Sequence, residues 1–88
     1  MKICFKPLFF RQIKKITDKS LKEHVEEAIK SVEKAGEKKD IPCLKKLKGY
    51  KIFYRIKVDN YRIGVTIESD TVTFVIFMPR KDIYKFFP

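Results

Sequence analysis

Apolar residues change their spacing along the chain, and each spacing predicts a different kind of element. The segment KICF (residues 2–5) alternates as a short strand does. Residues 8–16 carry apolar side chains at helical spacing, directly after Pro7, whose missing N–H costs nothing in the first turn of a helix. From residue 50 onward the period becomes two. The pattern therefore predicts a strand, a helical region and then a sheet.

A second helix is predicted by a regular apolar stripe. Ser20, with Glu23 three residues later, has the pattern of a capping box and would begin this helix, and Gly36 would end it. The segment TDKS (residues 17–20) separates the two helices, which should form an antiparallel hairpin. The stripe consists of Leu21, Val25, Ala28, Ile29, Val32 and Ala35.

Two β-hairpins are expected in the second half, closed by residues that tolerate a positive φ angle. The candidate turns are Asp59–Asn60 and Ser69–Asp70. The first turn pairs positions 58 with 61, 57 with 62, 56 with 63 and 55 with 64. The second pairs 67 with 72, 65 with 74, 63 with 76 and 61 with 78. Both registers gather apolar residues on one face, so they predict a three-stranded meander with one buried face.

These elements give an α+β fold with the order β-α-α-β-β-β, in one domain spanning residues 1–88. The helical hairpin should cover the apolar face of an antiparallel sheet. Residues 40–50 should form a connector, because Pro42 argues against a strand there. The tail KDIYKFFP (residues 81–88) should add a short C-terminal element.

The charge of the chain indicates an anionic partner. The sequence has 21 basic and 11 acidic residues, a net charge of +10. Residues 45–62 hold seven of the cations against a single acid, Asp59. Such an excess is common in proteins that bind a polyanion or an acidic protein.

The exposed face of the meander should gather Arg55, Lys57 and Arg62. In the predicted register Gly64 lies opposite Arg55 and leaves a hollow, and Phe77 lies beside Arg62 as an aromatic wall. Cations beside aromatic rings suit RNA, whose phosphates meet charge while unstacked bases meet rings. The alternative is a solvated face whose charges discourage edge pairing. Lys57 and Arg62 would repel each other across the strands, so a neutral residue at either position should stabilise the free fold and remove activity.

Further basic and aromatic residues extend the expected RNA-binding surface. They are Lys45, Lys46, Lys48, Lys51, Phe53, Phe77 and Lys81.

Residues 44–87 resemble the RelE/ParE superfamily, toxins of bacterial and archaeal type II toxin–antitoxin systems. The resemblance is carried by L-x-G before the first hairpin strand, then by YRIKVDNYRI, VTFVIF and the closing RKDIY. The first half of the chain matches in layout only. The implied fold is the RelE-like microbial RNase fold.

The resemblance to the RelE branch implies an mRNA endonuclease that acts in the ribosomal A site without a metal or other cofactor. In that branch the 2′-OH of the mRNA attacks the adjacent phosphorus, giving a 2′,3′-cyclic phosphate and a free 5′-OH. Carried over by position, Arg62 and Arg80 would hold the phosphate. Arg55, Lys57 and Tyr84 would serve proton transfer or orientation, and Tyr84 could instead stack on a base.

One departure from the family pattern keeps other functions open. Pro79 precedes Arg80 where many relatives carry His or Lys, so a general acid is missing there, and Lys81 could substitute for Arg80. The alternatives are a ParE-like inhibitor of DNA gyrase and a catalytically degenerate relative that binds only RNA or an antitoxin.

The expected partners are a cognate acidic antitoxin, mRNA and the ribosome, in a toxin–antitoxin hetero-oligomer. No membrane partner is expected, since no apolar run reaches the roughly 18 residues that a span needs. Cys4 and Cys43 have no metal-binding spacing and read as reduced thiols of a cytoplasmic protein. His24 reads as a helix-surface residue.

Overall fold

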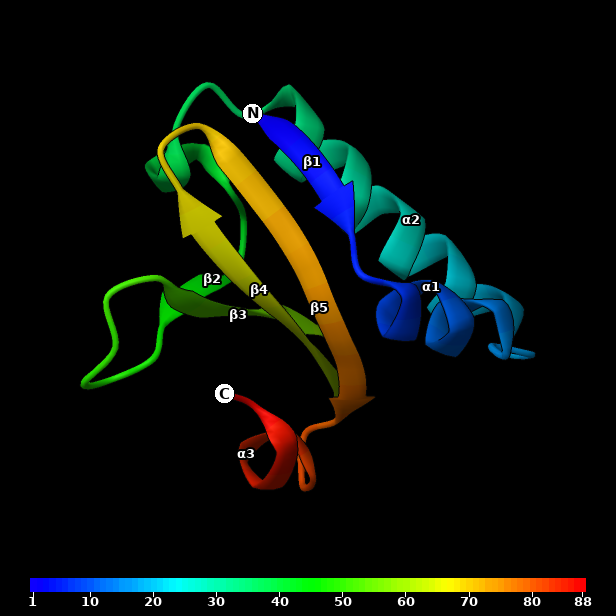
Figure 1. The fold of residues 1–88 in the computed structure, drawn as a ribbon. Coiled ribbons are helices and arrows are strands. Elements are labelled where there is room, and N and C mark those ends of the chain that lie inside the picture. Colours follow the sequence, from blue (N-terminus) through cyan, green and yellow to red (C-terminus); the bar gives the residue numbers. More distant parts are fainter.

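A five-stranded sheet with the strand order β1-β5-β4-β3-β2 forms the centre of the molecule (Figure 1). The computed structural model describes all of residues 1–88. Its elements are β1 (Lys2–Phe5), α1 (Pro7–Lys14), α2 (Lys19–Lys34), a 3-10 turn (Lys38–Asp40), β2 (Leu44–Lys46), β3 (Phe53–Val58), β4 (Tyr61–Glu68), β5 (Thr71–Pro79) and α3 (Ile83–Phe86). The α+β class is confirmed. The sheet is mixed rather than wholly antiparallel, because β1 runs parallel to β5.

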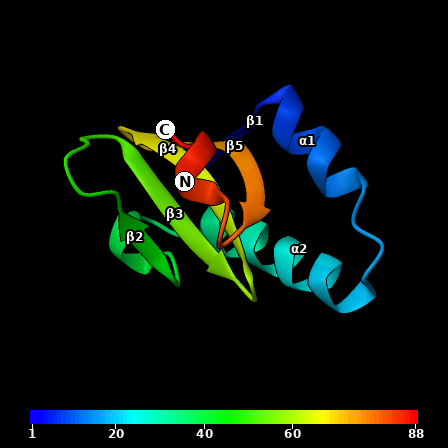
Figure 2. The ribbon, with the colours of Figure 1, turned by 90° about the horizontal axis from the view of Figure 1, so that it is seen from below.

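Helices α1 and α2 lie together on one face of the sheet (Figures 1 and 2). Phe9 of α1 and Val25 and Val32 of α2 are buried against Val65 and Phe74 of the strands. Burial of this apolar surface is the main stabilising term of such a layer pair. The predicted helical hairpin and its stripe are therefore confirmed.

The ends of α2 differ from the sequence prediction. The N-cap is Asp18, whose Oδ1 accepts a hydrogen bond of 3.1 Å from the backbone N–H of Leu21. Asp is as good an N-cap as Ser, and its position starts the helix two residues earlier than a Ser20 cap would. Ala35 forms the C-cap in an extended conformation, so the helix ends before Gly36.

The first hairpin has the predicted register, with Lys57 opposite Arg62 and Ile56 opposite Ile63. Asp59 adopts a φ of 53°, as the turn requires.

The second hairpin follows the prediction only as far as Val65, which lies opposite Phe74. A β-bulge then leaves Val75 unpaired, so Ile63 lies opposite Phe77 rather than Ile76. One extra residue turns each following side chain to the other face. Phe77 is consequently buried in the helix-covered core, and the predicted aromatic wall beside Arg62 is wrong.

The connector contains an additional strand that the sequence prediction missed. β2 begins two residues after Pro42 and pairs antiparallel with β3, placing Lys45 opposite Arg55. Pro42 itself stays outside the ladder, and β2 is a three-residue edge strand, where the constraint from proline is weakest.

The face away from α1 and α2 carries the C-terminal tail (Figure 2). Ile83 and Phe87 pack there with Leu47 and Ile76 in a second, smaller apolar cluster. A Cβ atom on Gly64 would lie 2.8 Å from the ring of Phe87 and from Ile76. The predicted hollow at Gly64 is therefore filled by Phe87. No helix in the structure is long and apolar enough to cross a membrane.

Candidate functional site

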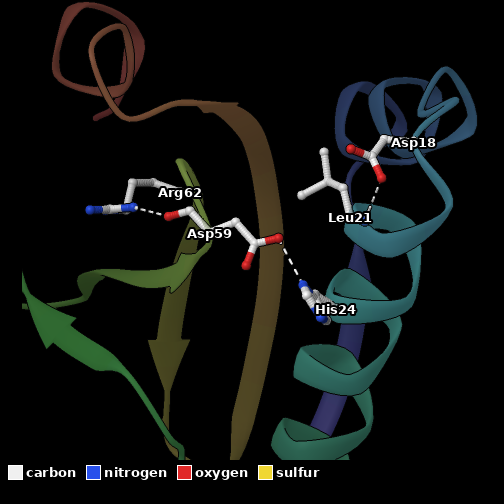
Figure 3. Close-up of polar contacts among 5 residues, drawn as sticks. All are labelled: Asp18, Leu21, His24, Asp59 and Arg62. Atoms are coloured by element: carbon white, nitrogen blue, oxygen red, sulfur yellow. Dashed lines mark hydrogen bonds and ion pairs between the residues drawn. The ribbon is translucent and has the colours of Figure 1, made fainter.

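Arg62 is the one charged side chain buried in this structure, with 7% of its surface exposed. Its Nη1 donates to the backbone oxygens of Asp59 (3.1 Å) and Tyr61 (2.8 Å), as Figure 3 shows for Asp59. These carbonyls fix the guanidinium beside the β3–β4 turn. The Nε and Nη2 groups have no protein acceptor, so they remain available to an anion.

Three further groups act electrostatically on Arg62. Burial lowers the pKa of Arg62 from its usual value, because desolvation disfavours the charged form. The charges of Arg55 and Arg80 lower this pKa further, whereas Tyr84 raises it. Residues from β3, from β4 and from the chain after β5 thus converge on one place, which is short of negative charge.

The backbone holds Arg80 against the β3–β4 turn. Its N–H donates to the carbonyl of Asn60 at 2.8 Å. Arg80 is exposed, and Tyr84 of α3 has 62% of its surface exposed. An open hollow of about 670 Å³ lies between this turn and the chain after β5. It is lined by Asn60, Tyr61, Pro79, Arg80, Lys81 and Tyr84.

Lys57 lies directly opposite Arg62, so its side chain starts on the same face of the sheet. Unlike Arg62, it is exposed. It lines a different hollow, of about 650 Å³, together with His24, Glu27 and Asp59. The structure therefore brings Arg62, Arg80 and Tyr84 together near the β3–β4 turn, with Arg55 and Lys57 beside them on β3.

The expected RNA-binding residues fall into three groups. The lysines are all exposed, but Lys46 lies opposite Tyr54 and so belongs to the helix-covered face of the sheet. Phe53 is half-buried, with its ring edge-on to Phe87 at 5.4 Å. Phe77 is stacked on Tyr61 at 4.7 Å and has 6% of its surface exposed, so it cannot meet a base. The exposed lysines are Lys45, Lys46, Lys48, Lys51 and Lys81.

The turn residue Asp59 also connects the site to α2. Its carboxylate lies 2.7 Å from Nδ1 of His24 (Figure 3). This hydrogen bond raises the pKa of His24 above its ordinary value of 6.5, and the negative charges of Asp59, Glu27 and Glu23 act in the same direction. Asp59 therefore contacts α2 through its side chain and Arg62 through its backbone oxygen.

Sequence reasoning missed Asn60 and Tyr61 as residues of the hollow. The sequence pattern places Asn60 in the turn and Tyr61 on the apolar face of the meander. It gives Pro79 only as a departure from the family pattern. The available signal was their position, because Asn60 and Tyr61 directly precede Arg62, and Pro79 directly precedes Arg80. No three His, Cys, Asp or Glu side chains lie close enough together to hold a metal ion.

Toxin RelE3 of Methanocaldococcus jannaschii is 40% identical to this chain over 89 residues, covering all of both chains. The chain belongs to the RelE family of toxins. It is a toxin of the toxin–antitoxin type. The resemblance of residues 44–87 is thus confirmed and extends over the whole length. No protein-family model matches the chain.

Solved structures share the fold of this RelE-like toxin. The RelB–RelE antitoxin–toxin complex from Methanococcus jannaschii contains a chain that is 31% identical, with a TM-score of 0.77. The match covers 97% of this toxin and 99% of that chain. The YoeB dimer from Staphylococcus aureus is 23% identical, with a TM-score of 0.69 over 89% of this toxin and 94% of that chain, a likeness of fold alone.

Proposed function

We propose that this RelE-like toxin is a ribosome-dependent endonuclease that cuts mRNA in the A site and so inhibits translation in the cytoplasm. One observation carries the proposal: the carbonyls of Asp59 and Tyr61 hold the guanidinium of Arg62 at the β3–β4 turn, and the Asn60 carbonyl of the same turn binds the backbone of Arg80. Cations held together without an anion attract a phosphate. In RNA, that phosphate lies next to the 2′-OH nucleophile.

The proposed reaction is an internal transfer of the phosphate. The 2′-oxygen forms a bond to phosphorus, and the bond from phosphorus to the 5′-oxygen of the next nucleotide breaks. The transition state gains negative charge on its non-bridging oxygens. Fixed donors aimed at developing charge are usually the largest single catalytic term. Arg62 suits this role because its backbone carbonyls hold it in place before substrate binds.

Proton transfer must accompany the bond changes. The 2′-OH loses a proton, and the departing 5′-oxygen gains one. We assign Arg80 to the phosphate with Arg62, and Arg55 and Tyr84 to proton transfer or orientation. We assign Lys57, directly opposite Arg62, to the same role as Arg55 and Tyr84.

We further propose that a cognate acidic antitoxin binds this toxin in a hetero-oligomer. The net charge of +10 favours an acidic partner. The similar RelE chain from Methanococcus jannaschii was solved as an antitoxin–toxin complex. Expression of the toxin with the product of an adjacent acidic reading frame should yield one co-purifying complex. Separate elution of the two chains at low salt would contradict this part of the proposal.

The decisive experiment is toe-printing of mRNA in a reconstituted translation reaction. We expect cuts within the A-site codon only when ribosomes are present, with a 2′,3′-cyclic phosphate at the upstream end. Absence of cuts, together with inhibition of DNA gyrase, would contradict the proposal and support the ParE-like alternative.

A second candidate is a relative that binds RNA or antitoxin without cutting. Pro79 favours it, because this residue occupies the last position of β5 and brings no titratable group to the cluster. Binding to ribosomes in a sedimentation assay, with no cut in the toe-print, would select this candidate.

A further inference from the structure

The hollow beside Arg80 has the size of a small-ligand site. Its volume of about 670 Å³ lies within the range of roughly 300–1,000 Å³ that is typical of such sites. It adjoins the cationic cluster through Arg80, which both lines the hollow and acts on Arg62. A phosphate held by the cluster would therefore leave its nucleoside close to the hollow.

Most of the hollow is held rigidly. The hydrogen bond from Arg80 N–H to the Asn60 carbonyl joins its two rims. Tyr61 lies opposite Pro79 in the β4–β5 ladder, and its ring is stacked on Phe77 with an interplanar angle of 6°. A preformed pocket loses less conformational entropy on binding than one that must be ordered.

Several residues that line the hollow have side chains without a partner in the protein. The side-chain amide of Asn60 makes no hydrogen bond, although the turn it occupies is fixed. Tyr84 is 62% exposed and stacks on no other ring. Arg80 and Lys81 form no ion pair. An aromatic face, a free carboxamide and unpaired cations match the three parts of a nucleotide.

We propose that this hollow binds the base of one unpaired nucleotide and that Asn60 makes it prefer adenine over guanine. The proposal deepens the proposed function and rests on it, since it names the base that the RNA presents. A carboxamide offers one donor and one acceptor side by side, which matches N7 and N6 of adenine. The same edge of guanine presents two acceptors, N7 and O6. Tyr84 stacks on the base, and Arg80 contacts its phosphate.

A binding experiment tests the pocket without the ribosome. The toxin is titrated with AMP, GMP and inorganic phosphate while NMR follows the side-chain amide of Asn60 and the ring of Tyr84. We expect AMP to bind at least roughly fivefold more tightly than GMP and to shift both residues. Phosphate should leave the Asn60 amide unmoved. Equal affinity for the two nucleotides, or nucleotide shifts that spare Asn60, would overturn the proposal.

A cutting experiment tests specificity on mRNA, using messages that differ only in single A-site bases. Asn60→Ala should lose the preference for adenine. Asn60→Arg should shift the preference toward guanine, since Arg pairs with N7 and O6 of guanine. Asp70→Ala is the matched control, because Asp70 occupies the same place in the other hairpin turn, after Ser69 with a φ of 54°.

The two proposals fail in different ways in these assays. If the unaltered toxin cuts no message, the proposed function fails. Tighter binding of AMP than of GMP, with NMR shifts at Asn60, would still support the pocket. If the toxin cuts and both Asn60 variants keep its base profile, the pocket proposal fails and the endonuclease stands. Circular dichroism of each variant establishes that the hairpin has folded.

Discussion

Lys57 and Arg62 lie directly opposite each other on β3 and β4, yet only Arg62 is buried. Arg62 turns toward the β3–β4 turn, where two backbone oxygens accept from its Nη1. Lys57 borders the hollow next to α2. The charges of Arg55 and Arg80 lower the pKa of Arg62. Register alone therefore leaves out Arg80, which acts on Arg62 from the chain after β5.

Arg80→Gln should stabilise the free toxin slightly, because it removes one of the charges that oppose Arg62. Arg80 is exposed and forms no ion pair, so little packing is lost. We expect a gain of at most about 0.5 kcal/mol at low ionic strength, shrinking with added salt. Urea unfolding at two salt concentrations measures it. Lys57→Gln is the matched exposed comparison and should gain less. An equal or larger gain at Lys57 would show that the cross-strand lysine opposes Arg62 at least as strongly as Arg80 does.

Arg62→Ala should destabilise the toxin, which reverses the expectation from sequence alone. The charged hydrogen bonds to two backbone oxygens and the buried stem are lost together. The expected cost is about 1–3 kcal/mol in the free energy of unfolding. Urea unfolding measures it, with Arg11→Ala on the exposed side of α1 as a control that should change little. A rise in stability would show that like-charge repulsion outweighs these bonds.

Arg80→Ala should lower the rate of ribosome-dependent cutting by roughly 10²–10³-fold, if this arginine stabilises the charge that develops on the phosphate. The substitution leaves the hydrogen bond from residue 80 to Asn60 intact, because that bond uses the backbone N–H. Single-turnover toe-printing gives the rate, and Arg11→Ala again serves as the control. A rate within a fewfold of the original would remove Arg80 from the phosphate site.

Gly64→Ala should loosen the C-terminal tail. The added Cβ would lie 2.8 Å from Phe87 and from Ile76, closer than real contacts allow. Forcing a group into a packed site costs typically 1–3 kcal/mol. We expect this loss in urea unfolding, together with faster amide hydrogen exchange in α3. Gly36→Ala is the matched control, since its nearest contact would be an ordinary 3.6 Å and the effect should be small.

The His24–Asp59 pair should make stability depend on pH. The pKa of His24 is raised in the folded state, so the protonated form is favoured by folding. The stabilising contribution of the His24–Asp59 pair is fully present below pH 6.5, the ordinary pKa of histidine. It is lost as the pH rises through the raised pKa of the folded state. NMR titration of this single histidine should give a pKa above 6.5.

Asp59→Asn should return the pKa of His24 toward 6.5 and flatten this part of the stability profile. Asn also tolerates the positive φ at position 59, so the turn is retained. Asp70→Asn, in the other hairpin turn, should leave the titration of His24 unchanged. An unshifted histidine in the original toxin would show that the hydrogen bond does not form in solution.

Most of the fold could be read from local patterns. The apolar residues of the two helices and of the hairpin strands recur at regular spacings, and one arrangement of these elements buries all of them. The first register followed because Asp59 and Asn60 leave little choice of turn. Of the expected catalytic residues, Arg55, Arg62, Arg80 and Tyr84 do converge. The register predicted Arg55 and Arg62 on one face, whereas Arg80 and Tyr84 were added through the family resemblance, since they lie beyond any register that the pattern specifies.

The misplacement of Phe77 has one cause, the bulge at Val75. The segment VTFVIF is apolar throughout, so alternation cannot tell which face each side chain takes. Gly64 was the available signal, because a glycine within a strand often marks a bulge or a close approach of another group. Both occur here, and together they move Phe77 into the core and put Phe87 over Gly64.

The sequence by itself determined the element order, the buried face and the excess of positive charge. These depend on periodicity and composition, which are local or summed properties. Only the tertiary structure decided that Arg62 is buried, that Phe77 lies in the core, and that a hollow opens beside Arg80. These features depend on a one-residue bulge and on the chain after β5 folding back against the β3–β4 turn. Segments that are distant in the sequence meet there, and no local pattern records such a contact.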